Sequence, residues 1–235
     1  MTTFALDTST PSPSLALIRG DVVVATLRLD ATPRAGRRVM MGAHELFTSS
    51  GVPVTDVDRV VVGVGPGAFT GVRVGISTAL GLAQALGCEV TGAVSAEAAA
   101  RGIAAVAPPG AVLVPASDAR RGELFAAAYR AAPGRALEEL LEPCAIAPEA
   151  LGARVAELCE AADAPALAAG DGAAALAPHL PGGASVAPEG SPAHLLDAVH
   201  LVACVDAGNG VPARPVYARL PDAEVNRLRA LGAAT

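Results

Sequence analysis

The chain has 235 residues, and its 17 basic and 23 acidic side chains give a formal net charge of −6. Every basic residue is an arginine, which excludes a P-loop NTPase, a Schiff-base enzyme and any other site that needs a lysine ammonium. The acidic balance argues against a protein that binds nucleic acid through a basic stripe. The combination of 52% hydrophobic and 17% charged residues excludes a disordered chain.

Apolar runs separated by turn residues predict an α/β protein in which strands and helices alternate. The expected strands are 4–7, 14–19, 22–28, 59–64, 89–94, 111–117, 123–129 and 166–169. The expected helices are 37–50, 72–86, 96–106, 148–161 and 191–207, with Ser95 as the N-cap of the third. A strand, an aspartate, a turn and a second strand follow one another at Asp7 and again at Asp118, which indicates two similar halves that meet near 108–110.

The cysteines and the apolar segments indicate the compartment. The four cysteines, at positions 88, 144, 159 and 204, are widely spaced and form no CxxC pair, as expected of buried residues in a reducing cytosol. No segment resembles a signal peptide or a membrane span. We therefore expect a cytoplasmic protein without a membrane partner.

Two charged turns are candidates for ligand binding. Asp7, Thr8 and Ser9 end a predicted strand and either hold a hydrated divalent ion and a phosphate or, as we favour, satisfy backbone amides of their own turn. Asp118 and Arg120 lie in the corresponding turn of the second half. They form either a polar patch at the mouth of a cleft or a solvated turn with weak ion pairs, and we again favour the simpler interpretation.

A glycine-rich segment, Gly65–Gly71, leads from the strand 59–64 into the next predicted helix. A helix N-terminus preceded by glycines suits an anion, but no lysine follows, so this is not a Walker A loop. Gly71, Gly75 and Ala79 stand four residues apart, and small residues at this spacing let a second helix approach closely. We favour packing against a partner over anion binding.

The chain offers little for catalysis. Its four histidines never stand four residues apart on a helix, and no GxSxG nucleophile elbow is present. We expect no catalytic residue and no metal site.

Four segments together resemble the TsaB (YeaZ) family, a bacterial subunit of the system that makes threonylcarbamoyladenosine in tRNA. They are ALDTSTPSPSLAL, VVVGVGPGAFTGVRVGISTALGLAQAL, DARRGELFAAAY and RPVYARLPDA, which span residues 4 to about 222 with a poorly matched middle at 134–190. One departure is that residues 34–38 replace a His-x-Glu-type helix start and precede an unusual Met40-Met41-Gly42, which implies altered partner geometry if that helix meets a partner.

The resemblance implies a two-lobed actin/Hsp70-like fold with ribonuclease H-like topology in each lobe. It divides the chain into an N-terminal lobe, 1–107, and a C-terminal lobe, 108–204, with 205–235 returning to the first lobe.

The resemblance also implies a non-catalytic scaffold rather than an enzyme. Such a subunit pairs with the catalytic paralogue TsaD, which transfers threonylcarbamoyl to adenosine 37 of tRNAs reading ANN codons, and it supports the ATPase TsaE. The paralogue binds a metal with two histidines on the helix after its glycine-rich loop, whereas the matching helix here has none. We expect this chain to bind no cofactor alone, with ATP and metal on its partners. We also expect it to form a homodimer when alone and to meet tRNA only through the complex.

The resemblance and the helix pattern place the partner interface on helices 37–50 and 70–87. The expected interface residues are Gly67, Phe69, Thr70, Gly71, Arg73, Gly75 and Ala79. Gly75→Leu is then expected to abolish association while leaving the monomer folded. The vestigial nucleotide or phosphate residues would be Asp7, Thr8, Ser9, Asp118 and Arg120.

Two other functions stay open. A sugar-kinase-like phosphotransferase would use Asp7 for a Mg²⁺-linked phosphate, but it needs phosphate-binding glycines in both lobes, and 118–122 offers arginines. A peptidase is less supported, because no metal pair, nucleophile elbow or Cys/His pairing is visible.

Overall fold

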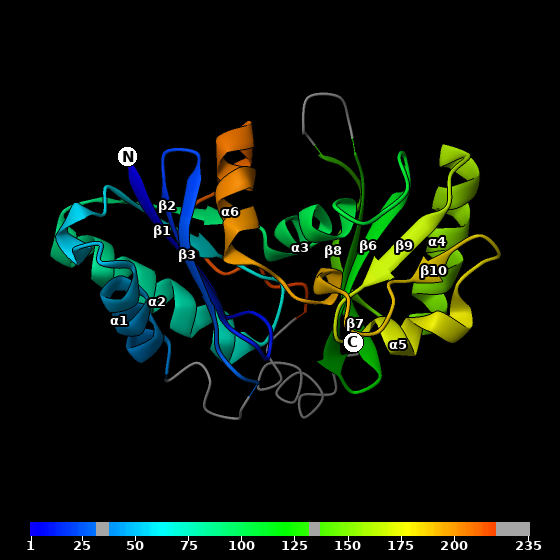
Figure 1. The fold of residues 1–235 in the computed structure, drawn as a ribbon. Helices are drawn as coiled ribbons and strands as arrows, with labels where there is room; N and C mark the ends of the chain where they lie inside the picture. The colour runs from blue at the N-terminus through cyan, green and yellow to red at the C-terminus, as the bar shows by residue number, and fades with distance from the viewer. Residues whose placement is uncertain (32–37, 132–136, 220–235) are drawn as a thin grey trace, which may run out of the picture.

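The structure is a computed structural model that describes residues 1–31, 38–131 and 137–219. Two five-stranded sheets lie in its two halves, with helices on their faces (Figure 1). The departure at 34–38 therefore lies largely outside the described residues, as does the end of the last matching segment. None of the helices within the described ranges is both long and apolar enough to cross a membrane.

The first sheet has the strand order β3-β2-β1-β4-β5. Its first three strands pair antiparallel, and β4 and β5 continue parallel to β1. The bounds are β1 Thr2–Asp7, β2 Ser14–Arg19, β3 Val22–Arg28, β4 Arg59–Gly63 and β5 Glu89–Ala93.

The second sheet repeats this topology. Its order is β8-β7-β6-β9-β10, again with two antiparallel pairings followed by two parallel ones. The bounds are β6 Val112–Arg120, β7 Glu123–Ala131, β8 Leu137–Ile146, β9 Ala166–Ala169 and β10 Ser185–Val186. The predicted two-lobed α/β fold with similar halves is confirmed.

Alternation along β1 decides which helices cover the first sheet. Phe4 and Leu6 point to one face, where they pack under α1 (Val39–Ser50) and α2 (Phe69–Leu86). Ala5 points to the other face, and this small residue packs with α6 (Ala198–Cys204). The larger apolar core of this lobe therefore lies beneath α1 and α2.

The helix α3 (Ser95–Ala104) lies between the two halves (Figure 1). Its residues Ala100 and Ile103 pack with Leu113 and Tyr129 on the near face of the second sheet. The opposite face of that sheet is covered by α4 (Pro148–Ala162) and α5 (Ala173–Leu176). Since α3 starts directly after β5, it carries the first lobe into contact with the second.

The long helix expected at 191–207 is wrong. The chain makes a 3₁₀ turn at Pro192–His194, and α6 starts only after Asp197, whose side chain accepts a hydrogen bond from the Val199 amide at 3.0 Å. Because α6 packs on β1 and β2, the chain is back on the first lobe by residue 198 rather than 205.

We predict that Leu17→Ala lowers the free energy of unfolding by about 2–5 kcal/mol, because this fully buried side chain would leave a cavity under α1. Leu80→Ala, at a side chain 48% exposed, is the control and is expected to change it by less than about 0.5 kcal/mol. Urea unfolding of both variants measures the difference, and equal effects would contradict the placement of this core.

Candidate functional site

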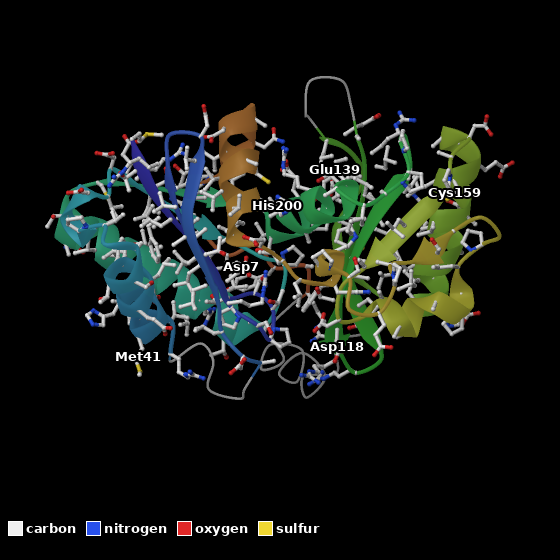
Figure 2. All side chains as sticks on the ribbon, viewed as in Figure 1. Asp7, Met41, Asp118, Glu139, Cys159 and His200 are labelled. Atoms are coloured by element: carbon white, nitrogen blue, oxygen red, sulfur yellow. The ribbon has the colours of Figure 1, made fainter. Side chains whose placement is uncertain are left out.

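Asp7 is the last residue of β1 and lies near the middle of the molecule (Figure 2). Its buried carboxylate is the centre of a hydrogen-bond cluster. Its Oδ1 accepts hydrogen bonds from the amide and the hydroxyl of Ser9, at 2.7 and 2.6 Å. Its Oδ2 accepts one from the Ser95 hydroxyl at 2.6 Å, and that hydroxyl accepts the Gly65 amide at 3.0 Å. One carboxylate thus joins the end of β1, the glycine-rich segment and the start of α3.

Ser95 was expected to be an N-cap, and this is wrong. It is the first residue of α3, and Val94 occupies the capping position without a side-chain hydrogen bond. The Ser95 hydroxyl instead donates to Asp7 Oδ2 and accepts from the Gly65 amide, so its donor and an acceptor position are both used outside the helix.

Burial raises the pKa of Asp7 above its ordinary value of 3.8, and the hydrogen bonds from Ser9 and Ser95 and the charge of Arg28 offset this only in part. Both carboxylate oxygens already accept hydrogen bonds within the protein. Oδ1 thus satisfies the Ser9 amide of its own turn, as in the favoured interpretation, whereas Oδ2 bonds to Ser95, which lies outside that turn. Across the described ranges no group of three or more His, Cys, Asp or Glu residues is arranged to hold a metal ion.

The small face of α2 is filled by this chain and not left open for a partner. The Thr8 hydroxyl donates a hydrogen bond to the Gly71 carbonyl at 2.6 Å, and a Cβ at Gly71 or Gly75 would collide with Thr8 oxygen atoms. Ala79 is fully buried in the core of the first lobe. A Cβ at Gly67 would likewise collide with Ser9.

Gly75 and Ala79 are buried within this chain, so the prediction that they contact a partner is corrected, whereas contact of the half-buried Gly67 and Gly71 with a partner stays a prediction. Helical periodicity showed that this face of α2 consists of small residues, but it could not show that the turn after β1 packs against it. Gly75→Leu would displace that turn, so it cannot separate association from folding.

Phe69, Thr70 and Arg73 are exposed at the start of α2. The Arg73 guanidinium lies 3.8 Å from the Phe69 ring centre, and its Nε donates a hydrogen bond to the Tyr217 hydroxyl at 2.8 Å. The rings of Phe69 and Tyr217 stack with their centres 5.4 Å apart. The structure thus ties the start of α2 to a segment almost 150 residues later.

Asp118 and Arg120 lie at the end of β6, next to its turn into β7, and Asp118 is at the lower edge of the second half (Figure 2). Asp118 accepts the Arg120 amide at 2.7 Å and pairs with its guanidinium at 3.2 Å. Asp171, which the sequence reasoning missed, accepts the Asp118 amide at 3.2 Å, and burial raises the pKa of Asp171. The signal was a strand, 166–169, followed at once by Gly-Asp-Gly.

Two cavities are lined by residues of both lobes. The smaller one has a volume of about 170 Å³, and the larger one of about 650 Å³ extends toward the start of α2. They share Ser9, Thr10, Pro11, Ser117, Phe125 and Asp171. The predicted turns of both halves therefore meet at one cleft, whose smaller cavity lies below the range of most ligand pockets, about 300–1,000 Å³.

A second candidate surface lies on the outside of the first lobe. Met40 and Met41 are 54% and 70% exposed on α1, and Met41 extends away from the helix (Figure 2). Beside them a groove of about 570 Å³ runs between α1 and the loop that follows it. We call this the docking face, and it is made of Met40, Met41, Ala43, His44, Phe47, Val52, Val54 and Leu82. Exposed apolar clusters of this kind mark interaction sites.

Two lobes of equal topology, each with an aspartate-bearing hairpin facing a common cleft, define the actin-like class of two-lobed α/β proteins. A family model described as "TsaD: tRNA N6-adenosine threonylcarbamoyltransferase" matches residues 31–170. The chain therefore belongs to this family, within its TsaB (YeaZ) group.

Individual relatives agree with this assignment. The chain is 31% identical over 134 residues to the tRNA threonylcarbamoyladenosine biosynthesis protein TsaB of Bacillus subtilis, covering 55% of this chain and 56% of that protein. It is 37% identical to TsaB of Escherichia coli over 132 residues, 55% of each chain. The matches thus span about half the length of these curated relatives.

Solved structures match over a larger share of the chain. YeaZ from Pseudomonas aeruginosa has a TM-score of 0.74 at 29% identity, over 92% of this chain and 99% of that one. A second P. aeruginosa structure, of an uncharacterized protein with similarity to peptidase YEAZ, has a TM-score of 0.73 at 29% identity, over 93% and 99%.

We predict that Asp7→Asn changes the pH dependence of stability. The raised pKa of Asp7 means that the folded wild type loses stability as pH rises from about 4 through that pKa, since ionisation is then less favourable in the folded than in the unfolded state. The asparagine side chain of the variant does not titrate, so the unfolding free energy of the variant minus that of the wild type should increase with pH.

Urea unfolding at several pH values measures this difference. Asp21→Asn, in the exposed turn between β2 and β3, is the matched control. A difference that is flat or falls with pH for Asp7→Asn would contradict the burial of a carboxylate at this position.

Proposed function

We propose that this chain is a non-catalytic subunit in the biosynthesis of threonylcarbamoyladenosine in tRNA. It would pair with the catalytic paralogue TsaD, which modifies adenosine 37 of tRNAs reading ANN codons, and support the ATPase TsaE. The relatives named TsaB support the pathway. The docking face is the observation that supports this role, because an apolar groove lined by the exposed Met40, with Met41 also exposed on the same helix, fits a protein partner.

The residues of α2 support a role without chemistry of its own. The helix Phe69–Leu86 contains no histidine, whereas the resemblance implies a metal-binding histidine pair on the matching helix of the paralogue. ATP and metal would accordingly be bound by the partners, in the cytoplasm, and tRNA would be met through the complex. Phe69, Thr70 and Arg73, exposed on the same helix, stay part of the proposed interface.

The same face would pair two copies of this chain when the paralogue is absent. A homodimer and a heterodimer that use one face exclude each other, so adding TsaD should convert one into the other. Analytical ultracentrifugation of the chain with and without TsaD follows this exchange.

We predict that Met40→Asp weakens the binding of TsaD at least about tenfold, because a carboxylate would be buried against an apolar partner surface. Val22→Asp, at an equally apolar side chain that is 66% exposed on β3, is the control and should leave the dissociation constant unchanged. Titration of labelled TsaD with each variant gives the two constants. Equal affinities for Met40→Asp and wild type would remove the docking face from the proposal.

A reconstituted modification assay tests the function itself. With TsaD, TsaE, ATP, the threonylcarbamoyl donor and tRNA present, omission of this chain should abolish modification, and Met40→Asp should require more subunit for the same rate. Modification that proceeds equally well without the chain would overturn the proposal. Calorimetry of the isolated chain with Mg-ATP covers the kinase-like alternative, which micromolar binding would favour.

A further inference from the structure

The segment that follows α6 runs along the first lobe toward the cleft. Val211 exchanges two backbone hydrogen bonds with Gly92, at 2.7 and 2.9 Å, next to the edge strand β5. Five residues later the Val216 amide donates a hydrogen bond to the Val64 carbonyl at 2.8 Å. This second bond places the segment against the glycine-rich loop.

The next residue fixes the segment to α2. Tyr217 stacks on Phe69, and its hydroxyl accepts the hydrogen bond from Arg73. Arg73 also lies over the Phe69 ring, so an arginine and two aromatic rings form one cluster. The three residues of this cluster belong to the first lobe and the segment.

Two residues further on, the segment contacts the second lobe. Arg219 pairs with Glu123 at 2.6 Å and donates a second hydrogen bond to the Ala119 carbonyl at 3.1 Å. Its guanidinium lies 5.9 Å from the centre of the Phe125 ring. Glu123, Ala119 and Phe125 all belong to the hairpin of β6 and β7, so residues 216–219 connect the lobes directly.

These contacts lie at one end of the space between the lobes, with α3 at the other. Ala96 and Ala99 of α3 line the smaller cavity, and 216–219 line the larger cavity, which shares lining residues with it. Helix α3 joins the first lobe to the second sheet through its packed core contacts. A hinge at α3 would therefore open the cleft at the end that 216–219 spans.

We propose that residues 216–219 are a latch that holds the two lobes together at the mouth of the cleft. The first-lobe half of the latch is the Tyr217 cluster, and the second-lobe half is the Arg219–Glu123 pair. Both halves are partly exposed, so each contributes modestly and the latch opens reversibly. Opening would widen the cleft without unfolding either sheet.

Hydrogen exchange of the whole chain, followed by mass spectrometry, tests the latch through effects that cross from one lobe to the other. Tyr217→Ala should speed exchange about twofold to fivefold in the hairpin 118–124, the range expected for losing one partly exposed contact. Arg219→Ala should do the same in the loop 64–73 of the first lobe.

The matched control is Arg214→Ala, at an exposed arginine of the same segment, which should leave both regions unchanged. Exchange in α4, on the far face of the second sheet, should stay at the wild-type rate in every variant, which distinguishes latch opening from unfolding. Glu123→Gln removes the ion pair from the hairpin side and should speed exchange in 64–73.

Purely local effects would overturn the proposal. If Tyr217→Ala changes exchange only in 64–73, and Arg219→Ala and Glu123→Gln change it only in 118–124, the segment contacts each lobe independently and no latch exists. If a segment variant also speeds exchange in α4, the result for Glu123→Gln decides, because this half-exposed hairpin residue lies outside both cores.

Discussion

A buried carboxylate fixes the geometry on which the rest of the first lobe depends. Asp7 accepts hydrogen bonds from Ser9 and Ser95, and the Ser95 hydroxyl in turn accepts one from the Gly65 amide. A carboxylate away from water costs free energy unless its oxygens are satisfied, so three segments distant in sequence are held in one arrangement. The start of α2, and with it the aromatic cluster around Tyr217, takes its position from this arrangement.

The two halves share a topology but differ in their aspartates. Asp7 is 1% exposed and bonded to distant segments, whereas the Asp118 side chain is 41% exposed and bonds to Arg120 in its own hairpin. In the second half, the partner of the hairpin backbone is Asp171, which is itself exposed. The cleft therefore does not present a pair of equivalent carboxylates, and the exposed apolar side chains of the docking face lie outside it.

Local patterns predicted elements whose determinants are close in sequence. The Gly20-Asp21 hairpin, the strand 59–64 and the helix after the glycine-rich loop are observed within a few residues of their expected bounds. Periodicity failed where a distant segment decides the outcome. It could show that Gly75 belongs to a small face but not that Thr8 fills this face, and it could not bring Ser95 to Asp7, 88 residues away. For Asp171 the local signal, Gly-Asp-Gly directly after the strand 166–169, was present, but its partner amide is 53 residues earlier and could not be identified.

The place of α3 has a consequence for how the molecule melts. Its first residue belongs to the hydrogen-bond cluster of Asp7, and Ala100 and Ile103 further along are buried against the second sheet. Unfolding of either lobe would therefore remove packing contacts that α3 makes with it and expose buried residues of this helix. Heating should therefore produce a single cooperative transition, with equal calorimetric and van't Hoff enthalpies, although the chain has two sheets and two cores.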